Sequence, residues 1–540
     1  MMRPVAALAL CLVALEATRC CNAQTPGNTV SSCLLSNGVK NFSLPGSPSY
    51  TPLLDSSIRN LRFELPGVGK PAAVVLPASK QELQRAILCA RSSSLAIRVR
   101  SGGHSYEGLS YTTEHHVPFA VIDLSNLNRV RVDPAGSGTA WAESGATLGE
   151  VYHAVGRASR TLAFPAGSCS TVGMGGHVAG GGFGLLSRKF GLSADNVLDV
   201  ILIEPSGRAL TRASMDDDVF WAVRGGGGGS WGVVYAWKLR LVPVPGNVTV
   251  FTPGRTGPVE AIAKLIHKWQ YVGPNLPDEF YLSMYIPTGS SSNGNVSVSF
   301  IGQVLGPKNL ALSVLSQRFP ELGLTESELS EVSWLESTAM FANLNSIGEL
   351  TDRQPGVGQY SKSKSDYVQA PNSIRDTIKI VQFLSNGEQG SIILDPYGGA
   401  MARIGSSETP FPHRAGYLYS IQYSVSWTAS ENDDRADEYI GWLRSFYAFM
   451  APYVSKNPRA AYVNYLDLDL GTNGWANATG GTSHNSVSHA ASWGKRYFLQ
   501  NFDRLVRAKS KVDPGNVFNN AQSIPPLHYE RSALKSVVGM

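Results

Sequence analysis

The sequence predicts an α+β fold divided between two domains, and three observations support this prediction. The chain has 540 residues, which is too long for a single hydrophobic core. Short segments typical of strands and helices alternate from residue 72 onwards. After Pro245 the pattern changes to longer amphipathic helices and strands, which indicates a second α+β domain.

The first domain is expected to alternate strands with helices around a glycine-rich stretch. Ser79 is placed to cap the first helix of this region, because serine at that position accepts a hydrogen bond from the first helical turn. We predict strands at 72–77, 96–103, 118–125, 129–133, 139–147, 197–204 and 233–244, and helices at 79–93 and 148–160, with a helical turn from 216.

The second domain is expected between residues 250 and 460, followed by a helix that returns to the first domain. Its predicted helices are 259–272 and 310–322, and its predicted strands are 280–287, 295–306 and 390–401. The sequence from 492 to 514 predicts the returning helix.

The N-terminus predicts a secretory signal peptide over residues 1–23. Arg3 precedes an apolar run from Val5 to Leu15, and Cys21-Asn22-Ala23 supplies a small-residue cleavage site. The alternative is a buried first helix; the run is too short to cross a bilayer. Removal of residues 1–23, which contain two Arg and one Glu, changes the net charge from +5 to +4. Such a small charge predicts no nucleic-acid partner, and no later stretch predicts a membrane span.

Three of the six cysteines remain after residue 23: Cys33, Cys89 and Cys169. In an oxidising compartment an odd number predicts one disulfide and one thiol with another role. The number of cysteines alone does not show which two of them form the disulfide. Because Cys169 lies among glycines and the other two lie in ordinary surroundings, we predict the bridge Cys33–Cys89. Secretion also agrees with the N-x-[ST] sequons, whose occupancy the sequence leaves open, at Asn41, Asn247, Asn295 and Asn477.

The stretch 164–191, FPAGSCSTVGMGGHVAGGGFGLLSRKFG, is the candidate cofactor site. Eight glycines lie between Gly173 and Gly191. Such a backbone lets a flat or anionic ligand approach the main chain, and its N–H groups bind anions. The spacing matches neither the dinucleotide nor the P-loop fingerprint. A close-packed structural turn is the alternative interpretation.

A second glycine turn follows the strand that contains Arg98 and Arg100. Both arginines are expected on one strand face, and a basic strand end before a glycine turn suits a pyrophosphate. The turn displays His104 and Tyr106. A single histidine is more often structural than functional, but here it accompanies an unpaired cysteine and two glycine clusters.

Other catalytic motifs receive no support. Gly228 to Gly232 match the hydrolase elbow G-x-S-x-G, and Gly227, Gly229 and Gly232 match G-x-G-x-x-G. Both motifs require a helix immediately afterwards, whereas residues 233–244 predict a strand. The histidines and cysteines show no metal-binding spacing, so we predict no metal site.

Six motifs together resemble the berberine bridge enzyme-like flavoproteins of plants, and in particular the group 4 pollen allergens of grasses. They are RSGGHSYEGLSY, GSCSTVGMGGHVAGGGFGLLSRKFGLSADNV, WAVRGGGGGSWGVV, FPHRAGYLYSIQYSVSW, YVNYLDLDLG and VDPGNVFNNAQSIPP. The resemblance covers nearly all of the mature chain. It implies a vanillyl-alcohol-oxidase-type FAD-binding domain (24–246), an inserted α+β substrate domain (247–461) and a C-terminal berberine-like segment (462–540) that returns to the FAD domain.

The resemblance implies that FAD is attached twice, through His104 to the flavin 8α-methyl group and through Cys169 to flavin C6. One departure is Ser170, where the family usually has proline. Val172 occupies a position that the family associates with oxygen access, and a valine there resembles oxidases that release hydrogen peroxide. The implied cofactor-binding residues further include Arg100, Ser101, Gly102, Gly103, Gly173, Gly175, Gly176, His177 and Gly180.

On the substrate side the resemblance points to Tyr106, Phe183, Ser420, Gln422 and Tyr465. Some members have tyrosine at the position of Phe183 and lysine at the position of Ser420. Gln422 replaces a catalytic glutamate, and an amide only orients by hydrogen bonding, so berberine-type ring closure is not expected.

Tyr465 or Tyr106 is therefore predicted to accept the proton, with Gln422 orienting the substrate. A phenol of pKa ~10 needs its pKa lowered by ~2–3 units, equivalent to ~3–4 kcal/mol, to act as a base at neutral pH. Relatives often place arginine after the equivalent of Tyr465, but this chain has Leu466. A structural tyrosine is the alternative role for Tyr465.

We expect a monomeric oxidase of the apoplast or cell wall that transfers hydride from an alcohol to FAD and electrons to oxygen. The candidate substrates are an oligosaccharide reducing end and an aromatic allylic alcohol, and the changes at Phe183 and Ser420 favour carbohydrate. The alternatives are a dehydrogenase with another electron acceptor, and an extracellular flavin-containing binding protein. The second alternative would explain the departures at Ser170, Ser420, Leu466 and Ala521.

Overall fold

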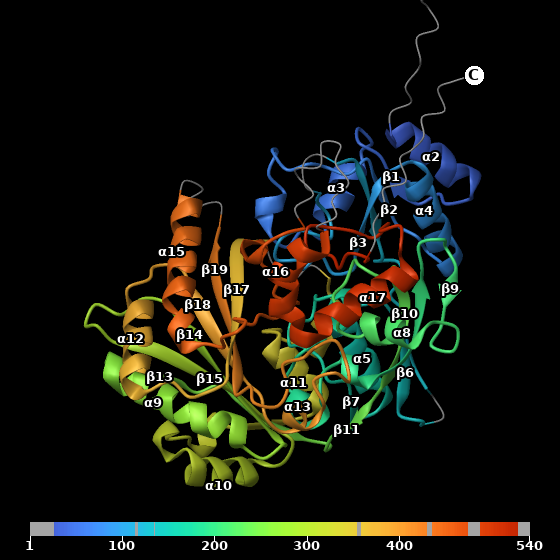
Figure 1. Ribbon diagram of the computed structural model, residues 1–540. Helices are drawn as coiled ribbons and strands as arrows, with labels where there is room; N and C mark the ends of the chain where they lie inside the picture. Colours follow the sequence, from blue (N-terminus) through green and yellow to red (C-terminus); the bar gives the residue numbers. More distant parts are fainter. Residues whose placement is uncertain are drawn as a thin grey trace, which may run out of the picture.

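The computed structural model describes residues 26–113, 117–133, 136–353, 358–428, 435–473 and 486–527 (Figure 1). The predicted signal peptide and the sequon at Asn477 lie outside these residues. Within them the chain has the predicted α+β fold, and the strands form sheets of four, five, two and eight strands. None of the helices in these ranges is long and apolar enough to cross a bilayer.

The N-terminal sheet has the order β1-β2-β4-β3, with strands Phe42–Ser43, Ala73–Val75, Phe119–Asp123 and Ala96–Arg100. β4 pairs in parallel with both β2 and β3. The crossover from β2 to β3 is helix α4 (Lys80–Ser92), and Ser79 accepts a hydrogen bond from the Glu82 N–H as predicted. The parallel strands direct the end of β3 into the turn that contains His104.

The neighbouring antiparallel sheet has the order β5-β6-β10-β8-β9. Its strands are Val130–Val132, Thr139–Glu143, Val233–Arg240, Val197–Ile203 and Ala209–Leu210. Helices α2 (Pro26–Ser36) and α3 (Tyr50–Asp55) contact β2 of the first sheet. The other elements of this part of the chain are α5 (Leu148–Ala158), α6 (Met174–Ala179), α7 (Ser187–Phe190), α8 (Asp217–Val223) and the paired strands β7 (Leu162–Ala163) and β11 (Val242–Pro243).

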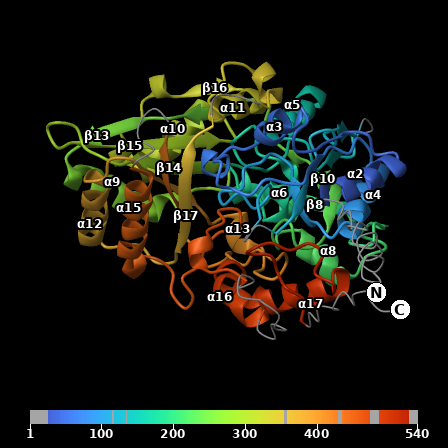
Figure 2. The same cartoon turned by 90° about the horizontal axis from the view of Figure 1, so that it is seen from above.

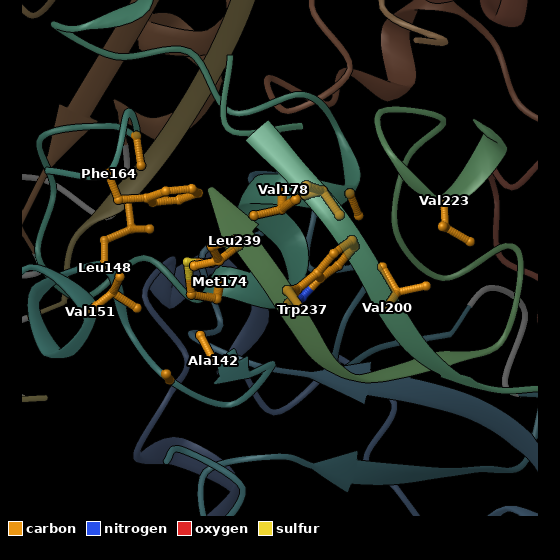
Figure 3. Close-up of a cluster of buried hydrophobic side chains, with 14 of the residues drawn as sticks. Ala142, Leu148, Val151, Phe164, Met174, Val178, Val200, Val223, Trp237 and Leu239 are labelled. Atoms are coloured by element: carbon orange, nitrogen blue, oxygen red, sulfur yellow. The ribbon is translucent and has the colours of Figure 1, made fainter. Parts of the chain in front are cut away.

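Helix α6 is held against this sheet by its apolar side chains. Met174 and Val178, which are fully buried, lie one turn apart and pack in the core that contains Trp237 and Leu239 of β10 (Figure 3). The glycines of α6 therefore face away from the core.

The largest sheet has the order β16-β12-β15-β14-β18-β19-β17, and β13 pairs with β15. Its pairs are antiparallel. Figure 2 shows α9, α12 and α15 gathered along one side of this sheet. The strands are β12 (Val248–Phe251), β13 (Gly254–Gly257), β14 (Phe280–Pro287), β15 (Val296–Val304), β16 (Ser330–Val332), β17 (Tyr360–Val368), β18 (Ser391–Pro396) and β19 (Tyr419–Trp427). The helices of this region are α9 (Val259–Val272), α10 (Lys308–Arg318), α11 (Trp334–Phe341), α12 (Ile374–Ser385), α13 (Ala400–Arg403) and α15 (Ala436–Phe449).

Alternation along β19 separates an apolar face from a polar one. Ile421, Tyr423 and Val425 pack in the core beneath the helices. Because successive side chains point to opposite faces of a sheet, Ser420 and Gln422 face the other way. This second face carries the polar residues of the site described below.

The C-terminal region differs from the predicted single helix 492–514. It contains two helices, α16 (Ser486–Phe498) and α17 (Phe502–Val512), because Leu499 has a positive φ of 46° and begins a 3₁₀ turn. α17 packs on α8 of the N-terminal region, as the colours of Figure 1 also show. The limits of the predicted domains stay predictions.

Candidate active site

Two glycine turns meet at the centre of the site. An ideal Cβ on Gly102 would lie 2.4 Å from the Gly173 nitrogen, and one on Gly173 would lie 2.0 Å from Ser101 Oγ. Any larger residue at either position would force the two turns apart. This close approach brings His104, which follows the first turn, near Cys169, which precedes the second.

A cavity of about 400 Å³ runs along these turns. Most of the predicted site residues line it: Ser101, Gly102, Gly103, His104, Tyr106, Cys169, Val172, Gly173, Gly175, Gly176, His177 and Tyr465. The cavity is also lined by residues that were not predicted from the sequence: 226–230, Asn464, Asn520 and Gln522. Two of the quoted motifs, WAVRGGGGGSWGVV and VDPGNVFNNAQSIPP, contain most of these residues and were the available signal.

The backbone around this cavity fits a flat cofactor. A Cβ on Gly176 would meet no atom within 4 Å, and the nearest atom to a Cβ on Gly228 lies 3.8 Å away. Side chains at these two positions would enter open space. Glycine therefore leaves main chain exposed along the cavity, as FAD would need, and His104 and Cys169 are among the residues that line it.

Five of the residues predicted at the site do not line this cavity: Arg100, Gly180, Phe183, Ser420 and Gln422. The Arg100 guanidinium is buried, and it donates to Asp123 Oδ2 at 2.5 Å and to the carbonyl oxygens of Leu53 and Leu54. Its charge is thus neutralised inside the protein, which differs from the expected phosphate contact. Gly180 instead packs on Asn464, and Gln422 reaches the site through Tyr106.

Arg98 lines the cavity, but its guanidinium is also engaged with main chain. It donates to the Thr112 carbonyl oxygen at 2.6 Å and to the Asn519 carbonyl oxygen at 2.5 Å. The basic strand end therefore ties the β3 region to the C-terminal segment.

His104 and Cys169 both contact the side-chain oxygen of Thr171. The His104 Nε2 atom is 2.9 Å from Thr171 Oγ1, and the Cys169 sulfur is 3.6 Å from the same oxygen. Burial, and to a lesser extent the Arg59 guanidinium, lowers the pKa of His104 to about 4. The imidazole is therefore neutral at neutral pH.

Cys169 is exposed and forms no disulfide, whereas Cys33 and Cys89 are bonded. This confirms the predicted pairing. A free thiol that lines a glycine-rich cavity is available to a bound ligand.

His177 lies further along the cavity as a neutral acceptor. Burial lowers its pKa to about 4, and its Nε2 accepts a hydrogen bond from the Gly167 N–H at 3.1 Å. Its hydrogen is consequently on Nδ1.

The three predicted catalytic residues are brought together from distant segments. Gln422 Nε2 lies 2.6 Å from the Tyr106 hydroxyl oxygen and donates to it, and the rings of Tyr106 and Tyr465 stack with centroids 5.6 Å apart. Burial raises the pKa of both phenols, and the nearby Asp395 carboxylate adds to this effect. The surroundings thus oppose the lowered pKa that the sequence analysis required of a tyrosine base.

A buried charge cluster fixes the segments that carry these tyrosines. Lys362 of β17 donates to Glu107, which follows Tyr106, and lies 3.0 Å from Asp467 Oδ1. Lys364 lies 2.5 Å from Asp467 Oδ2. Because the cluster links β17 to both tyrosine-bearing segments, it sets the stacking of the two rings.

Asp395 is a buried carboxylate that the sequence analysis did not identify. It lies on β18 opposite Ser420 and accepts a hydrogen bond from the Tyr281 hydroxyl. Burial raises its pKa to about 6, although the Tyr281 hydrogen bond opposes the change. Tyr281 neighbours Phe183, with ring centroids 6.5 Å apart. An aspartate inside the apolar segment SIILDP was the available signal.

The hydrolase and dinucleotide interpretations of the five-glycine loop are excluded by its surroundings. Strand β10 follows the loop where both motifs require a helix. Ser230 is 2% exposed, and its hydroxyl accepts from the Ile524 N–H. Among the described residues there is also no group of three or more potential metal ligands.

Two family descriptions match the chain: "FAD binding domain" at residues 71–212 and "Berberine and berberine like" at residues 461–525. Reticuline oxidase of Eschscholzia californica is 46% identical over 510 residues, which cover 94% of this chain and 93% of the relative. A monolignol oxidoreductase of Arabidopsis thaliana is 42% identical over 508 residues, which cover 91% of this chain and 92% of the relative.

Solved structures agree with these matches. Berberine bridge enzyme from Eschscholzia californica superposes with a TM-score of 0.89 at 45% identity and covers 93% of this chain and all of its own. The Bermuda grass isoallergen BG60, a pollen group 4 allergen, gives 0.87 at 41% identity, with 92% and 100% covered. A doubly substituted variant of Phl p 4, described as a glucose oxidase, gives 0.86 at 42% identity, with 93% and 100% covered. The predicted family and fold type are confirmed.

Proposed function

Because the chain belongs to the berberine bridge enzyme-like family of FAD-linked oxidoreductases, we propose that it is a secreted oxidase that carries FAD on both His104 and Cys169. The observation that supports this most directly is that a neutral imidazole and a free thiol, which both line the glycine-rich cavity, contact the same hydroxyl. Bound there, FAD accepts a hydride from the substrate. Dioxygen is the proposed final electron acceptor, and Val172 lines the cavity at the position expected for an oxidase.

The proposed substrate is an alcohol, either an oligosaccharide reducing end or an aromatic allylic alcohol. The names of two relatives, a glucose oxidase variant and a monolignol oxidoreductase, support these two classes. Phe183 stacks on Tyr397 with centroids 5.1 Å apart and offers no hydroxyl, and Ser420 is buried opposite Asp395. The absence of a tyrosine and a lysine at these two positions favours a carbohydrate.

In this proposal the stacked tyrosines hold the substrate and Asp395 accepts its proton. Tyr106, oriented by Gln422, and Tyr465 stay protonated because burial raises their pKa values. A phenol that stays protonated orients a substrate hydroxyl by hydrogen bonding. Asp395 has a pKa near that of an effective general base at neutral pH.

An anaerobic flavin-bleaching screen with cello-oligosaccharides, glucose and coniferyl alcohol tests the function. We expect one class to bleach the flavin, and air to restore its colour within seconds with release of hydrogen peroxide. Recovery over many minutes would instead indicate a dehydrogenase. Bleaching by dithionite but by none of the alcohols would favour a binding protein. Denaturation in acid tests the cofactor separately, since doubly attached FAD stays with the polypeptide.

A further inference from the structure

Thr171 contacts both side chains that are proposed to carry FAD. Its hydroxyl lies within hydrogen-bonding distance of His104 Nε2 at 2.9 Å and near the Cys169 sulfur at 3.6 Å. Thr171 itself is only 5% exposed, so its position is fixed by packing. Together with Arg59, these residues line a second cavity of about 600 Å³ beside the glycine turns.

The Thr171 hydroxyl has one hydrogen to donate and lone pairs that accept, so it serves both contacts at once. Both contacts are satisfied when the imidazole Nε2–H donates to Thr171 and the Thr171 hydroxyl donates to the sulfur. Both are also satisfied when the Thr171 hydroxyl donates to Nε2 and accepts from the Cys169 S–H. In either arrangement one hydroxyl holds the ring and the sulfur.

The shared hydroxyl orients both nucleophiles. It engages the His104 imidazole through Nε2 rather than Nδ1, and it contacts the Cys169 sulfur at the same time. The Arg59 guanidinium lines the same cavity.

We propose that Thr171 is a positioning residue for the attachment of FAD, an inference that rests on the double attachment proposed above. Each attachment forms one N–C or S–C bond and removes one hydrogen from the nucleophile and one from the flavin carbon. The two hydrogens and their electrons reduce one dioxygen to hydrogen peroxide. The Thr171 hydroxyl is not consumed, and it acts by holding the His104 imidazole and the Cys169 sulfur in position.

Thr171→Val tests the role of the hydroxyl, because valine keeps the shape of threonine. Secreted protein is digested, and mass spectrometry measures the share of the His104 and Cys169 peptides that carries FAD. We expect the doubly linked share to fall at least tenfold, and acid to release the remainder of the flavin.

Two variants serve as controls. Thr171→Ser retains the hydroxyl and should keep the doubly linked share within about twofold of that of the wild type. Ser170→Ala removes a neighbouring hydroxyl and should leave the share unchanged. If Thr171→Val is not secreted in folded form, the smaller Thr171→Ala replaces it.

The proposal is overturned if the valine or alanine variant is doubly linked like the wild type, or if the serine variant is as defective as they are. Wild-type protein that releases all its flavin in acid would instead contradict the double attachment. The two failures are therefore distinguishable.

Discussion

Asp395→Asn tests how one buried carboxylate links stability to pH. Burial raises the pKa of Asp395 from its usual 3.8 to about 6. At ~1.36 kcal/mol per pH unit, this difference means that ionisation removes ~3 kcal/mol from the stability of the folded state. Asparagine carries no charge, and its carbonyl oxygen can accept the hydrogen bond from Tyr281. We therefore expect the variant to be more stable by ~3 kcal/mol at neutral pH.

The sign of the pH dependence follows from the raised pKa. The folded state holds its proton more tightly than the unfolded state, so the wild type loses stability as pH rises from about 4 to about 6. The advantage of the variant should be near zero at about pH 4 and complete above pH ~6.5. With an unfolding entropy of ~2.1 cal/mol/K per residue, this advantage corresponds to a Tm difference of ~3 °C for the chain.

Thermal unfolding measured across this pH range is the assay. Tyr281→Phe provides a matched comparison, since it removes the hydrogen bond that stabilises the Asp395 carboxylate and should raise the pKa of this residue further. In the proposed reaction, Asp395→Asn should also lower kcat by ~10²–10⁴-fold. A Tm difference that is equal at pH 4 and pH 7 would refute the argument, because ionisation would then not be its cause.

The remaining predictions concern the charge cluster, the disulfide and the oxygen position. Lys362→Met leaves the buried Glu107 carboxylate without its ammonium partner and should cost ~3–5 kcal/mol, measured as a lower Tm, whereas exposed Lys379→Met should leave Tm unchanged. The double substitution Cys33→Ser/Cys89→Ser opens a loop of sequence separation 56 and should cost ~4 kcal/mol in denaturant unfolding; an unchanged midpoint would contradict this. Val172→Ile should slow reoxidation of the reduced flavin in stopped-flow measurements, and an unaltered rate would remove the proposed role of this position in oxygen access.

Much of the fold followed from local patterns in the sequence. Residues 259–272 and 280–287 were predicted with the bounds that the structure has, because each segment shows a complete hydrophobic period. The break at Leu499 was not predicted, since a positive φ at a non-glycine residue depends on the packing of the two helices around it.

The residues of the candidate site were likewise predicted only in part from the sequence. His104 and Cys169 are marked by glycine turns and by an odd number of cysteines, which are properties of the chain itself. Arg100 is not available to a ligand because it pairs with Asp123 of the neighbouring parallel strand. The sequence of the strand that contains Arg100 does not indicate this partner.

The sequence by itself therefore determined the family, the secondary-structure pattern, the disulfide and the residues proposed to hold FAD, because motifs, spacing and periodicity are local properties. Only the tertiary structure decided which charges are available and which acid–base groups are shifted. Ion pairs form between segments as distant as Glu107, Lys362 and Asp467. Burial, together with neighbours from other segments such as Tyr281, rather than residue type, sets the pKa of Asp395 and of the stacked tyrosines.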